Sequence, residues 1–373
     1  MKLVKPNLEK VLTDVFFKTS RFQFCLLLFL LAHLFIFYLF YYSNTLFQDP
    51  LNTFSDAFVR FDSNWYLTIL NKGYSTSENY HLFQDYAFFP LYPILVAGFH
   101  FLTHASFSLS GVFVSNIAFF IALYFFYPLL IERGFDEKQT RFTLLLLSLS
   151  PANIYFVSVY TESLFLALSV LSIYFAFKSQ WIRAFLFAGL ISATRPNGIC
   201  IILPLLLILG KEYLETRKFK LSYLGIILAP AGLVAYMVYL HLHVGNYLAF
   251  VHAQLAWGRT GWIHGHLWPQ FRSQFLFSGY STPFVFLFFL ALYVLWKSKY
   301  YIELIYLLIM MAPAFMSGQG TGLGRFIMVL FPMYMACTLF VKNRPYLTIF
   351  TILSFGLFLG LNICAWTAGG WVV

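Results

Sequence analysis

The sequence of 373 residues has little charge and few cysteines. Only 10% of its residues are charged and 60% are hydrophobic, whereas a typical soluble protein has about 25% charged and about 45–50% apolar residues. This composition excludes a soluble globular protein. The four cysteines lie in apolar stretches and form no CxxC or Cys–His pattern, so we interpret them as small buried hydrophobic residues: Cys25, Cys200, Cys337 and Cys364.

Common signatures of soluble catalytic sites are also missing. The sequence has no GxGxxG, Walker A, HExxH or GxSxG pattern, so neither a nucleotide cofactor nor a zinc peptidase site is indicated. The formal net charge is +10, but the basic residues lie in short loops between apolar runs. We therefore expect no nucleic-acid partner and interpret the basic residues as signals of membrane topology.

Long apolar runs dominate what is present. Aromatic residues reach 21%, with 47 Phe and 25 Tyr, and the mean hydropathy is +0.75. These features predict an all-α polytopic membrane protein with about 11 transmembrane helices, forming one integral membrane domain over residues 1–373. The expected spans are 22–42, 107–131, 142–157, 161–177, two short spans within 181–209, 221–240, 281–296, 301–316, 326–340 and 346–364.

Two segments are irregular. Residues 181–209 are too long for one comfortable span, and Arg195-Pro196-Asn197-Gly198 interrupts them with helix-breaking residues. We expect two short spans that meet at this polar turn. Residues 88–102 carry Pro90 and Pro93 and are short for a span, so they could cross the membrane or form an interfacial helix.

The distribution of basic residues decides between these two options. With 88–102 interfacial, 18 of the 24 lysines and arginines lie on one side of the membrane, which the positive-inside rule identifies as cytoplasmic. A spanning segment there would nearly abolish this asymmetry. We therefore predict a cytoplasmic amino terminus and two long outer segments, a first outer loop at 43–102 and a second outer loop at 241–279.

In the first outer loop, Asp62 is the one carboxylate of the aromatic-rich segment 59–66. Burial would raise its pKa and a nearby cation such as Arg60 would lower it, so Asp62 is a candidate general base. An ordinary helix cap or surface acid is the alternative. The neighbouring Arg60, Trp65 and Tyr66 are candidate substrate-binding residues, although such aromatic residues are also typical of an interfacial belt.

Three further charged residues are candidates on the outer side. Glu162 lies at membrane depth, where a carboxylate is costly unless it is paired or faces water; it could instead cap the next helix. Arg195, with Asn197 beside it, and Arg325, which follows a glycine-rich stretch, are candidates for holding a phosphate. Turns with snorkelling arginines are the alternative.

The second outer loop contains Gln254, Trp257 and Arg259, which could form a platform for a sugar. Two His-x-His pairs, at 241–243 and 264–266, invite a metal site, but no acidic residues accompany them. We therefore predict no metal and no other cofactor.

Taken in order, these segments resemble the PIG-V-type GPI mannosyltransferases and their bacterial relatives, which are membrane glycosyltransferases of the GT-C class. The matching segments extend from about residue 60 to 332: Phe61-Asp62-Ser63-Asn64-Trp65-Tyr66 with Gly73-Tyr74, Phe88-Phe89-Pro90-Leu91-Tyr92-Pro93, Ser150-Pro151-Ala152, Tyr160-Thr161-Glu162-Ser163, Ala193-Thr194-Arg195-Pro196-Asn197-Gly198, Ala253-Gln254 with Trp257, and Gly324-Arg325-Phe326 with Phe331-Pro332. Phe61 stands where the family commonly has tryptophan.

The resemblance implies a GT-C-like fold with interfacial helices in the first outer loop. It also implies an inverting mannosyltransferase that takes mannose from a polyprenyl-phosphate carrier, such as dolichyl phosphate mannose, on the non-cytoplasmic side. In this role Asp62 is the base and Glu162 supports it. Arg195 and Arg325 hold the phosphate, while Gln254 and Trp257 line the sugar or acceptor site.

The partners implied are the lipid-linked sugar donor, a glycolipid, glycan or other hydroxyl acceptor, and membrane lipid. Because eukaryotic members are longer, we expect a bacterial cell (inner) membrane, or the endoplasmic reticulum membrane for a eukaryotic chain. A lipid-linked-sugar flippase and a non-catalytic scaffold are the competing functions. A transporter typically has paired broken helices and midplane charges, whereas the polar residues here gather on one side.

Overall fold

The computed structural model describes residues 19–47, 56–79, 82–259, 281–317 and 322–370. This part of the chain is helical, which confirms the all-α prediction. Its helices are α2 (Arg21–Phe47), α3 (Ser63–Lys72), α4 (Leu91–Thr103), α5 (Phe107–Glu132), α6 (Glu137–Ser148), α7 (Asn153–Val157), α8 (Glu162–Phe177), α9 (Trp181–Ser192), α10 (Ile202–Thr216), α11 (Ala231–Val244), α12 (Ala249–Ala256), α15 (Thr282–Lys297), α16 (Tyr301–Met316), α17 (Leu323–Met328), α18 (Pro332–Val341) and α19 (Pro345–Thr367). The 3-10 helices are η1 (Asp56–Phe58), η2 (Asp85–Ala87), η3 (Pro196–Ile201) and η4 (Leu221–Leu228).

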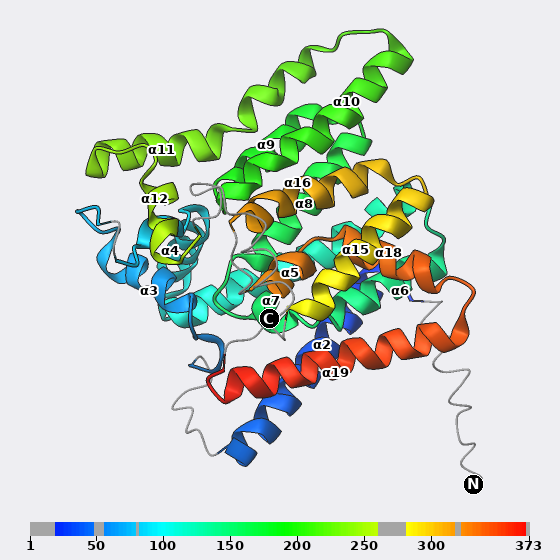
Figure 1. The fold of residues 1–373 in the computed structure, drawn as a ribbon, viewed down its shortest axis with the longest axis horizontal. Helices are drawn as coiled ribbons and strands as arrows, with labels where there is room; N and C mark the ends of the chain where they lie inside the picture. Colours follow the sequence, from blue (N-terminus) through cyan, green and yellow to red (C-terminus); the bar gives the residue numbers. More distant parts are fainter. Residues whose placement is uncertain (1–18, 48–55, 80–81, 260–280, 318–321, 371–373) are drawn as a thin grey trace.

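Helix α19 runs along the long axis of the molecule, and α2 crosses it obliquely (Figure 1). Five segments of the described chain are long and apolar enough to cross a membrane: Arg21–Ser43, Phe107–Glu132, Pro196–Thr216, Leu221–Val244 and Pro345–Thr367. Six shorter apolar helices accompany them. The protein is therefore a multi-pass membrane protein, and the number of about 11 spans stays a prediction.

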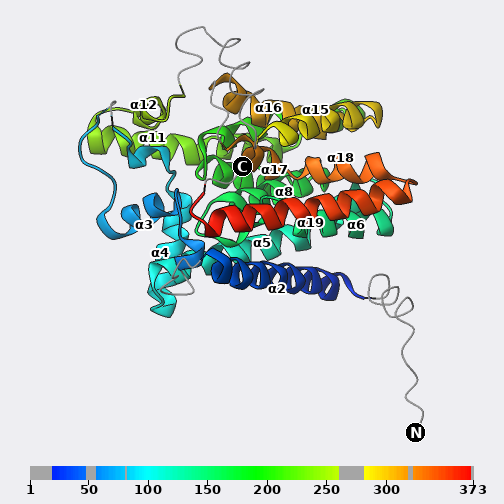
Figure 2. The ribbon, with the colours of Figure 1, turned by 60° about the horizontal axis from the view of Figure 1, so that its bottom comes forward.

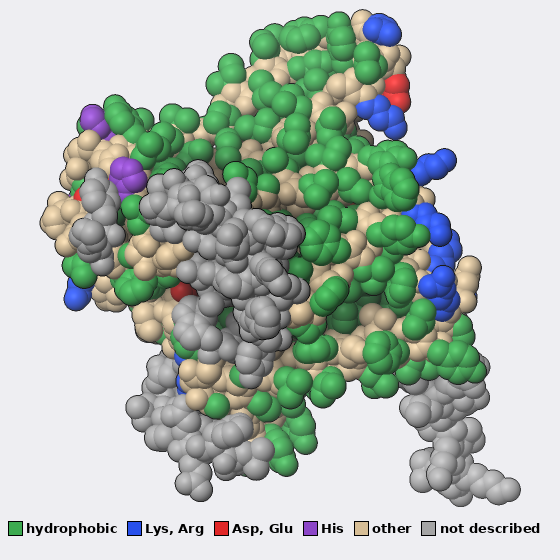
Figure 3. Space-filling view, in the orientation of Figure 1, with side chains coloured by type: hydrophobic (Ala, Val, Ile, Leu, Met, Phe, Trp, Pro, Cys, Tyr) green, Lys and Arg blue, Asp and Glu red, His purple; other side chains and the backbone are tan. Residues whose placement is uncertain are grey.

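Helix α8 forms the centre of the bundle. All of its residues except Tyr174, Phe175 and Phe177 are buried, and it packs against α5 and α9. Apolar side chains on the outer helices, by contrast, are exposed: Leu34 of α2 is 64% exposed and Leu353 of α19 is 66% exposed. Hydrophobic side chains cover most of the visible face (Figure 3). Such a surface requires lipid around it.

The polar turn within 181–209 lies where the sequence predicts it. Helix α9 ends at Ser192, and η3 begins at Pro196, which cannot donate a helical hydrogen bond. Gly198 is required at this turn, because a Cβ atom there would lie 2.3 Å from the carbonyl oxygen of Ile191. The chain therefore turns tightly enough to bring Gly198 back against the end of α9.

Two predicted spans are interrupted. The expected helix over 142–157 is wrong, because α6 ends at Ser148 and the short α7 follows. Pro151 lacks the N–H that a continuous helix needs there. The expected helix over 326–340 is likewise divided into α17 and α18, with Pro332 in the first turn of α18. Both breaks let the chain turn near the same end of the bundle.

Helix α4 covers most of the segment that we expect to be interfacial. It has 13 residues and runs across the direction of α2 and α19 (Figure 2). At its start, the backbone N–H of Leu91 donates to the carbonyl oxygen of Ala193, 3.1 Å away. Helices α3, α4 and α12 thus lie together at one end of the molecule (Figure 1).

The basic residues mark the opposite end. Lysines and arginines gather at the edge of the molecule where α10, α15 and α18 end, and the visible face near α3 and α4 shows few (Figure 3). The sequence segments at those ends carry Lys211, Arg217, Lys218, Lys220, Lys297, Lys299, Lys342 and Arg344. The two ends of the bundle are therefore chemically different.

Candidate active site

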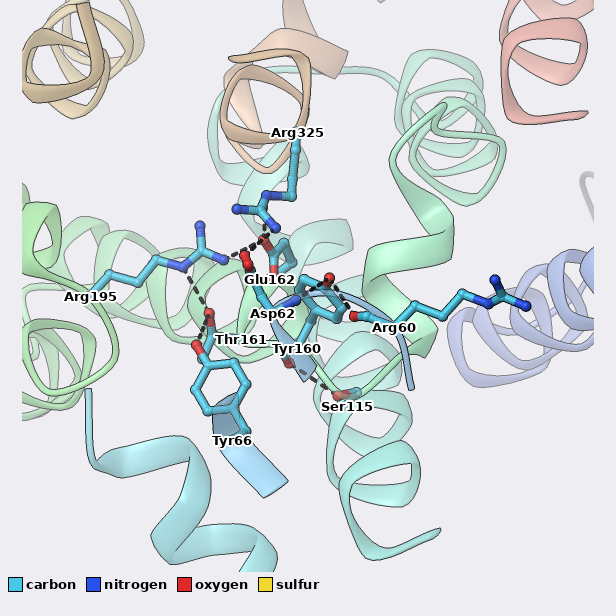
Figure 4. A network of polar contacts seen from close by, with 9 residues as sticks. All are labelled: Arg60, Asp62, Tyr66, Ser115, Tyr160, Thr161, Glu162, Arg195 and Arg325. Carbon is cyan, nitrogen blue, oxygen red and sulfur yellow. Dashed lines mark hydrogen bonds and ion pairs between the residues drawn. The ribbon is translucent and has the colours of Figure 1, made fainter. Parts of the chain in front are cut away.

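Asp62 lies between η1 and α3, and its side chain is 18% exposed. It occupies the N-cap position of α3, but its side chain makes no capping hydrogen bond. Instead, its Oδ2 accepts a hydrogen bond from Nη1 of Arg325 at 2.8 Å. The helix-cap interpretation of Asp62 therefore fails. Arg60 was expected to supply the neighbouring cation, and this is wrong, because its side chain points away from Asp62 (Figure 4).

Glu162 lies in the first turn of the central helix α8 and is fully buried. Its Oε1 forms ion pairs with Nη2 of Arg195 at 2.5 Å and with Nε of Arg325 at 3.3 Å. A carboxylate in the first turn of a helix is also favoured by the helix dipole, but the Glu162 side chain makes no capping hydrogen bond. Glu162 thus holds two arginines from distant parts of the chain.

Arg325 of α17 joins the two carboxylates into one network (Figure 4). Its side chain is 8% exposed, so the ion pairs have little screening by water. Arg195 is fixed from another direction, because its Nε donates to Oγ1 of Thr161 at 2.8 Å. The hydroxyl of the buried Tyr66 donates to the same Oγ1 at 3.4 Å. Tyr66 therefore helps to fix the Thr161 hydroxyl to which Arg195 donates.

Arg259 is the third arginine near this network. Its Nη1 donates to Oε1 of Gln254 at 2.6 Å, and no carboxylate of the described residues forms an ion pair with it. The guanidinium carbons of Arg195, Arg259 and Arg325 lie 5.9, 5.6 and 5.0 Å from the centroid of the Phe326 ring. The three guanidinium groups thus all lie within 6 Å of one aromatic ring.

The electrostatics of Arg259 reflect this crowding. Burial, followed by the positive charges of Arg325 and Arg195, lowers the pKa of Arg259 to about 10, and Asp62 opposes the shift. The cluster contains three arginines and only two carboxylates. It therefore has one cation more than its own acidic groups pair with, and an added anion would be stabilised there.

Aromatic side chains line the neighbouring region. The Trp65 ring stacks on Phe88 with 5.7 Å between ring centroids. Trp257, which follows α12, meets Trp65 edge-on at 5.8 Å and Phe83 at 4.9 Å. The first and second outer segments thus join through these rings, and the rings supply a face of the kind that binds sugars.

Two predicted residues keep their side chains out of the ion pairs with Asp62 and Glu162. The Asn197 side chain donates to the carbonyl oxygen of Met310 in α16 at 3.3 Å, so it fastens η3 to a neighbouring helix. Arg60 takes part through its backbone carbonyl, which accepts a hydrogen bond from the hydroxyl of Tyr160. Sequence reasoning missed Tyr160 and Thr161 as site residues. Their only signal was their position directly before Glu162 in the matching segment.

The histidines of the pair at 241–243 make other contacts. His241 stacks on Tyr247 with 3.9 Å between ring centroids, and Nε2 of His243 lies 3.0 Å from the carbonyl oxygen of Ser75. The pair at 264–266 lies outside the described residues. Among those that are described, no three His, Cys, Asp or Glu side chains form a metal-binding group, and the absence of a metal stays a prediction.

Two comparisons relate this arrangement to known proteins. Residues 42–220 match the model of a family described as Mannosyltransferase (PIG-V). The chain is also 27% identical over 199 residues to GPI mannosyltransferase 2 of Schizosaccharomyces pombe (strain 972 / ATCC 24843). That match covers 52% of this chain and 41% of the relative, so it spans less than half of the relative's length.

Asp62, Glu162 and Arg195 lie within the matched region, whereas Gln254, Arg259 and Arg325 lie beyond it. The ion pairs of Arg325 nevertheless join it to the matched carboxylates. Residues 42–220 are therefore similar to the PIG-V mannosyltransferase family, the family that the sequence motifs resemble.

Proposed function

We propose that this protein is a membrane glycosyltransferase that moves a mannosyl residue from a polyprenyl-phosphate carrier to a hydroxyl acceptor. One observation carries the proposal: Asp62 and Glu162 meet three arginines beside an aromatic wall, and the arginines outnumber the carboxylates. A lipid-linked sugar has a phosphate for the cations, a sugar for the aromatic face and a lipid tail for the membrane.

Asp62 is the general base in this proposal. Its carboxylate takes the proton of the acceptor hydroxyl while the acceptor oxygen bonds to the anomeric carbon of mannose. The bond between that carbon and the carrier phosphate oxygen breaks, and the polyprenyl phosphate leaves with the bonding electrons. This single displacement inverts the anomeric configuration. A positioned base contributes typically about 10²–10⁴-fold to the rate.

The arginines stabilise the departing phosphate. Arg325 now pairs with Asp62, so a bound phosphate competes for this guanidinium and loosens its hold on the base. Arg195 and Arg259 add positive charge near Phe326, and Glu162 orients two of the three guanidinium groups. Such preorganised charge is most effective where burial limits screening by water. The proposal needs no cofactor, because Asp62 supplies the base and the arginines supply the charge.

The proposed site opens to the non-cytoplasmic side. This placement is supported by the basic residues at the opposite end of the bundle (Figure 3). It makes the first outer loop, residues 43–102, part of the site. The name of the yeast relative suggests a GPI precursor or a similar glycolipid as acceptor. The membrane is that of the endoplasmic reticulum in a eukaryote and the inner membrane in a bacterium.

The test uses purified protein in lipid vesicles with radiolabelled polyprenyl-phosphate mannose or polyprenyl-phosphate glucose, and a membrane glycolipid extract as acceptor. We expect label from the mannose donor to become covalently attached to acceptor, with less transfer from glucose. Movement of intact donor across the bilayer without any glycosidic transfer would establish the flippase instead. Efficient transfer from the glucose donor alone would overturn the mannose assignment.

A further inference from the structure

Phe61, directly before the proposed base, has an unusual backbone conformation. Its φ is +54°, in the left-handed region that bulky L-residues avoid. The other described non-glycine residues with positive φ all lie at or just after the carboxyl end of a helix: His104, Ser179, Arg217, Lys299 and Asn343. Left-handed residues are common at such ends. Phe61 instead precedes a helix, so helix termination does not account for its conformation.

The hydroxyl of Tyr160 bridges the two peptide groups on either side of Phe61. It donates a hydrogen bond to the carbonyl oxygen of Arg60 at 2.9 Å and accepts one from the backbone N–H of Asp62 at 3.2 Å. Tyr160 is 1% exposed. Its own carbonyl oxygen accepts a hydrogen bond from Oγ of Ser115 on α5, which ties it to the core.

The ring of Phe61 contacts Trp366, near the end of α19. The two rings meet edge-on with 5.5 Å between centroids, and Trp366 is fully buried. The Trp366 indole N–H donates to the carbonyl oxygen of Ala57 in η1 at 2.8 Å. Tyr160 and Trp366 therefore fix the backbone and the side chain of the same strained residue.

We propose that Tyr160, assisted by Trp366, is a positioning residue for Asp62. Backbone strain persists only where its surroundings enforce it. Relaxing Phe61 to a negative φ would redirect the chain at Asp62 and turn its carboxylate away from Arg325. The hydroxyl of Tyr160 opposes this relaxation by holding the peptide groups on both sides. The inference rests on the proposed function, because it assigns Tyr160 a role through the general base.

Tyr160→Phe tests the proposal, because it removes the bridging hydroxyl and keeps the buried ring. We expect kcat to fall by roughly tenfold to hundredfold, since a small misplacement of a catalytic group is that costly. KM for the lipid donor and the melting temperature should change little. The matched control is Tyr236→Phe. Tyr236 is also 1% exposed and donates to a backbone carbonyl, that of Tyr86, so its loss should leave kcat unchanged.

A double-mutant comparison separates positioning from a structural role. In the Asp62→Asn background, Tyr160→Phe should cost almost nothing further, because no base is left to position. Equal losses of kcat in the two backgrounds would overturn the inference, as would near wild-type kcat for Tyr160→Phe. If either result came with an inactive Asp62→Asn variant, the positioning role of Tyr160 would be wrong but Asp62 would remain the proposed base. A fully active Asp62→Asn variant would overturn both.

Trp366→Phe is the second variant, for use should Tyr160→Phe not fold. It removes the hydrogen bond to Ala57 and keeps an aromatic ring against Phe61. A smaller fall in kcat at unchanged donor KM supports the inference. Unchanged kcat overturns the part assigned to Trp366.

Discussion

Two buried glutamates at opposite ends of the bundle show how differently the same residue types are used. Glu303 of α16 is 1% exposed and pairs with one arginine, Arg133, through both carboxylate oxygens at 2.5 and 3.1 Å. Glu162 forms ion pairs with two arginines through one oxygen, and neither of its carboxylate oxygens has a hydrogen-bond partner among the described residues.

The difference lies in charge balance. The pair at the basic end matches one cation with one anion, and it fastens α16 to the end of α5. The cluster around Glu162 has a cation in excess and includes a residue with a strained backbone, Phe61. We interpret the balanced pair as structural and the unbalanced cluster as a site for an anionic ligand.

The largest effect is expected from removing the proposed base. Asp62→Asn keeps the shape of the side chain and removes its proton affinity, so turnover should fall by roughly 10²–10⁴-fold. Radiolabel transfer by purified protein measures this, with the melting temperature as a check on folding. Glu162→Gln should cost less turnover if Glu162 only orients the arginines. The reverse order would make Glu162 the leading candidate for the base.

The matched variant at the other end should lose stability and keep its activity. Glu303→Gln leaves Arg133 without its carboxylate. Because Arg133 is 20% exposed, we expect a loss of roughly 1–3 kcal/mol, less than for a fully buried pair. Thermal unfolding in detergent measures the loss. Turnover per folded molecule should equal that of the wild type. A fall in turnover would contradict the interpretation of Glu303 as a purely structural residue.

The shape of the guanidinium groups should matter for donor binding. Arg195→Lys and Arg325→Lys keep the charge and lose the planar fork, so KM for the donor should rise by roughly tenfold to hundredfold. Arg133→Lys is the control at the basic end and should leave donor KM unchanged. If neither site variant changed donor kinetics, Arg195 and Arg325 would be purely structural.

A smaller effect is expected at Arg259, which contributes charge without a carboxylate partner. Arg259→Gln should raise donor KM by roughly threefold to tenfold, the range of one charge-assisted hydrogen bond of modest strength. It should also weaken the dependence of KM on ionic strength, because the excess cation is removed. Salt titrations of initial rates would show this, and an unchanged salt dependence would argue against a phosphate at Arg259.

The sidedness of the two ends can be tested without changing activity. In a background without the native cysteines, Thr76→Cys in the first outer loop should react with an impermeant reagent added outside cells. Lys218→Cys at the basic end should not react. Both positions are exposed. Labelling of Lys218→Cys from outside would place the proposed site on the cytoplasmic side.

The sequence predicted more of the fold than of the contacts. Apolar runs identified the helices and Pro196 located the break before η3, because length and helix-breaking residues act locally. The division of the spans at Pro151 and Pro332 was missed. Those prolines lie within apolar runs of spanning length. Whether the helix breaks there depends on tertiary packing, which the hydrophobic pattern of the sequence does not reveal.

In the site, residue types were predicted and partners were not. Asp62 was assigned a neighbouring cation, but the choice of Arg325 over Arg60 depends on tertiary structure that brings α17 to the first outer loop. The left-handed conformation of Phe61 and the bridging hydroxyl of Tyr160 have no sequence signal, since an aromatic residue is an improbable occupant of positive φ.

The most direct test of the account measures binding of polyprenyl phosphate and of neutral polyprenol to wild-type protein and to Asp62→Asn. In the proposed mechanism Asp62 is the base, and the arginines bind the phosphate. Wild-type protein should therefore bind the phosphate form roughly tenfold to hundredfold more tightly than the alcohol. Asp62→Asn should bind it at least as tightly, because Arg325 is then released from its carboxylate partner. Equal affinity for phosphate and alcohol, or loss of phosphate binding in Asp62→Asn, would contradict the account.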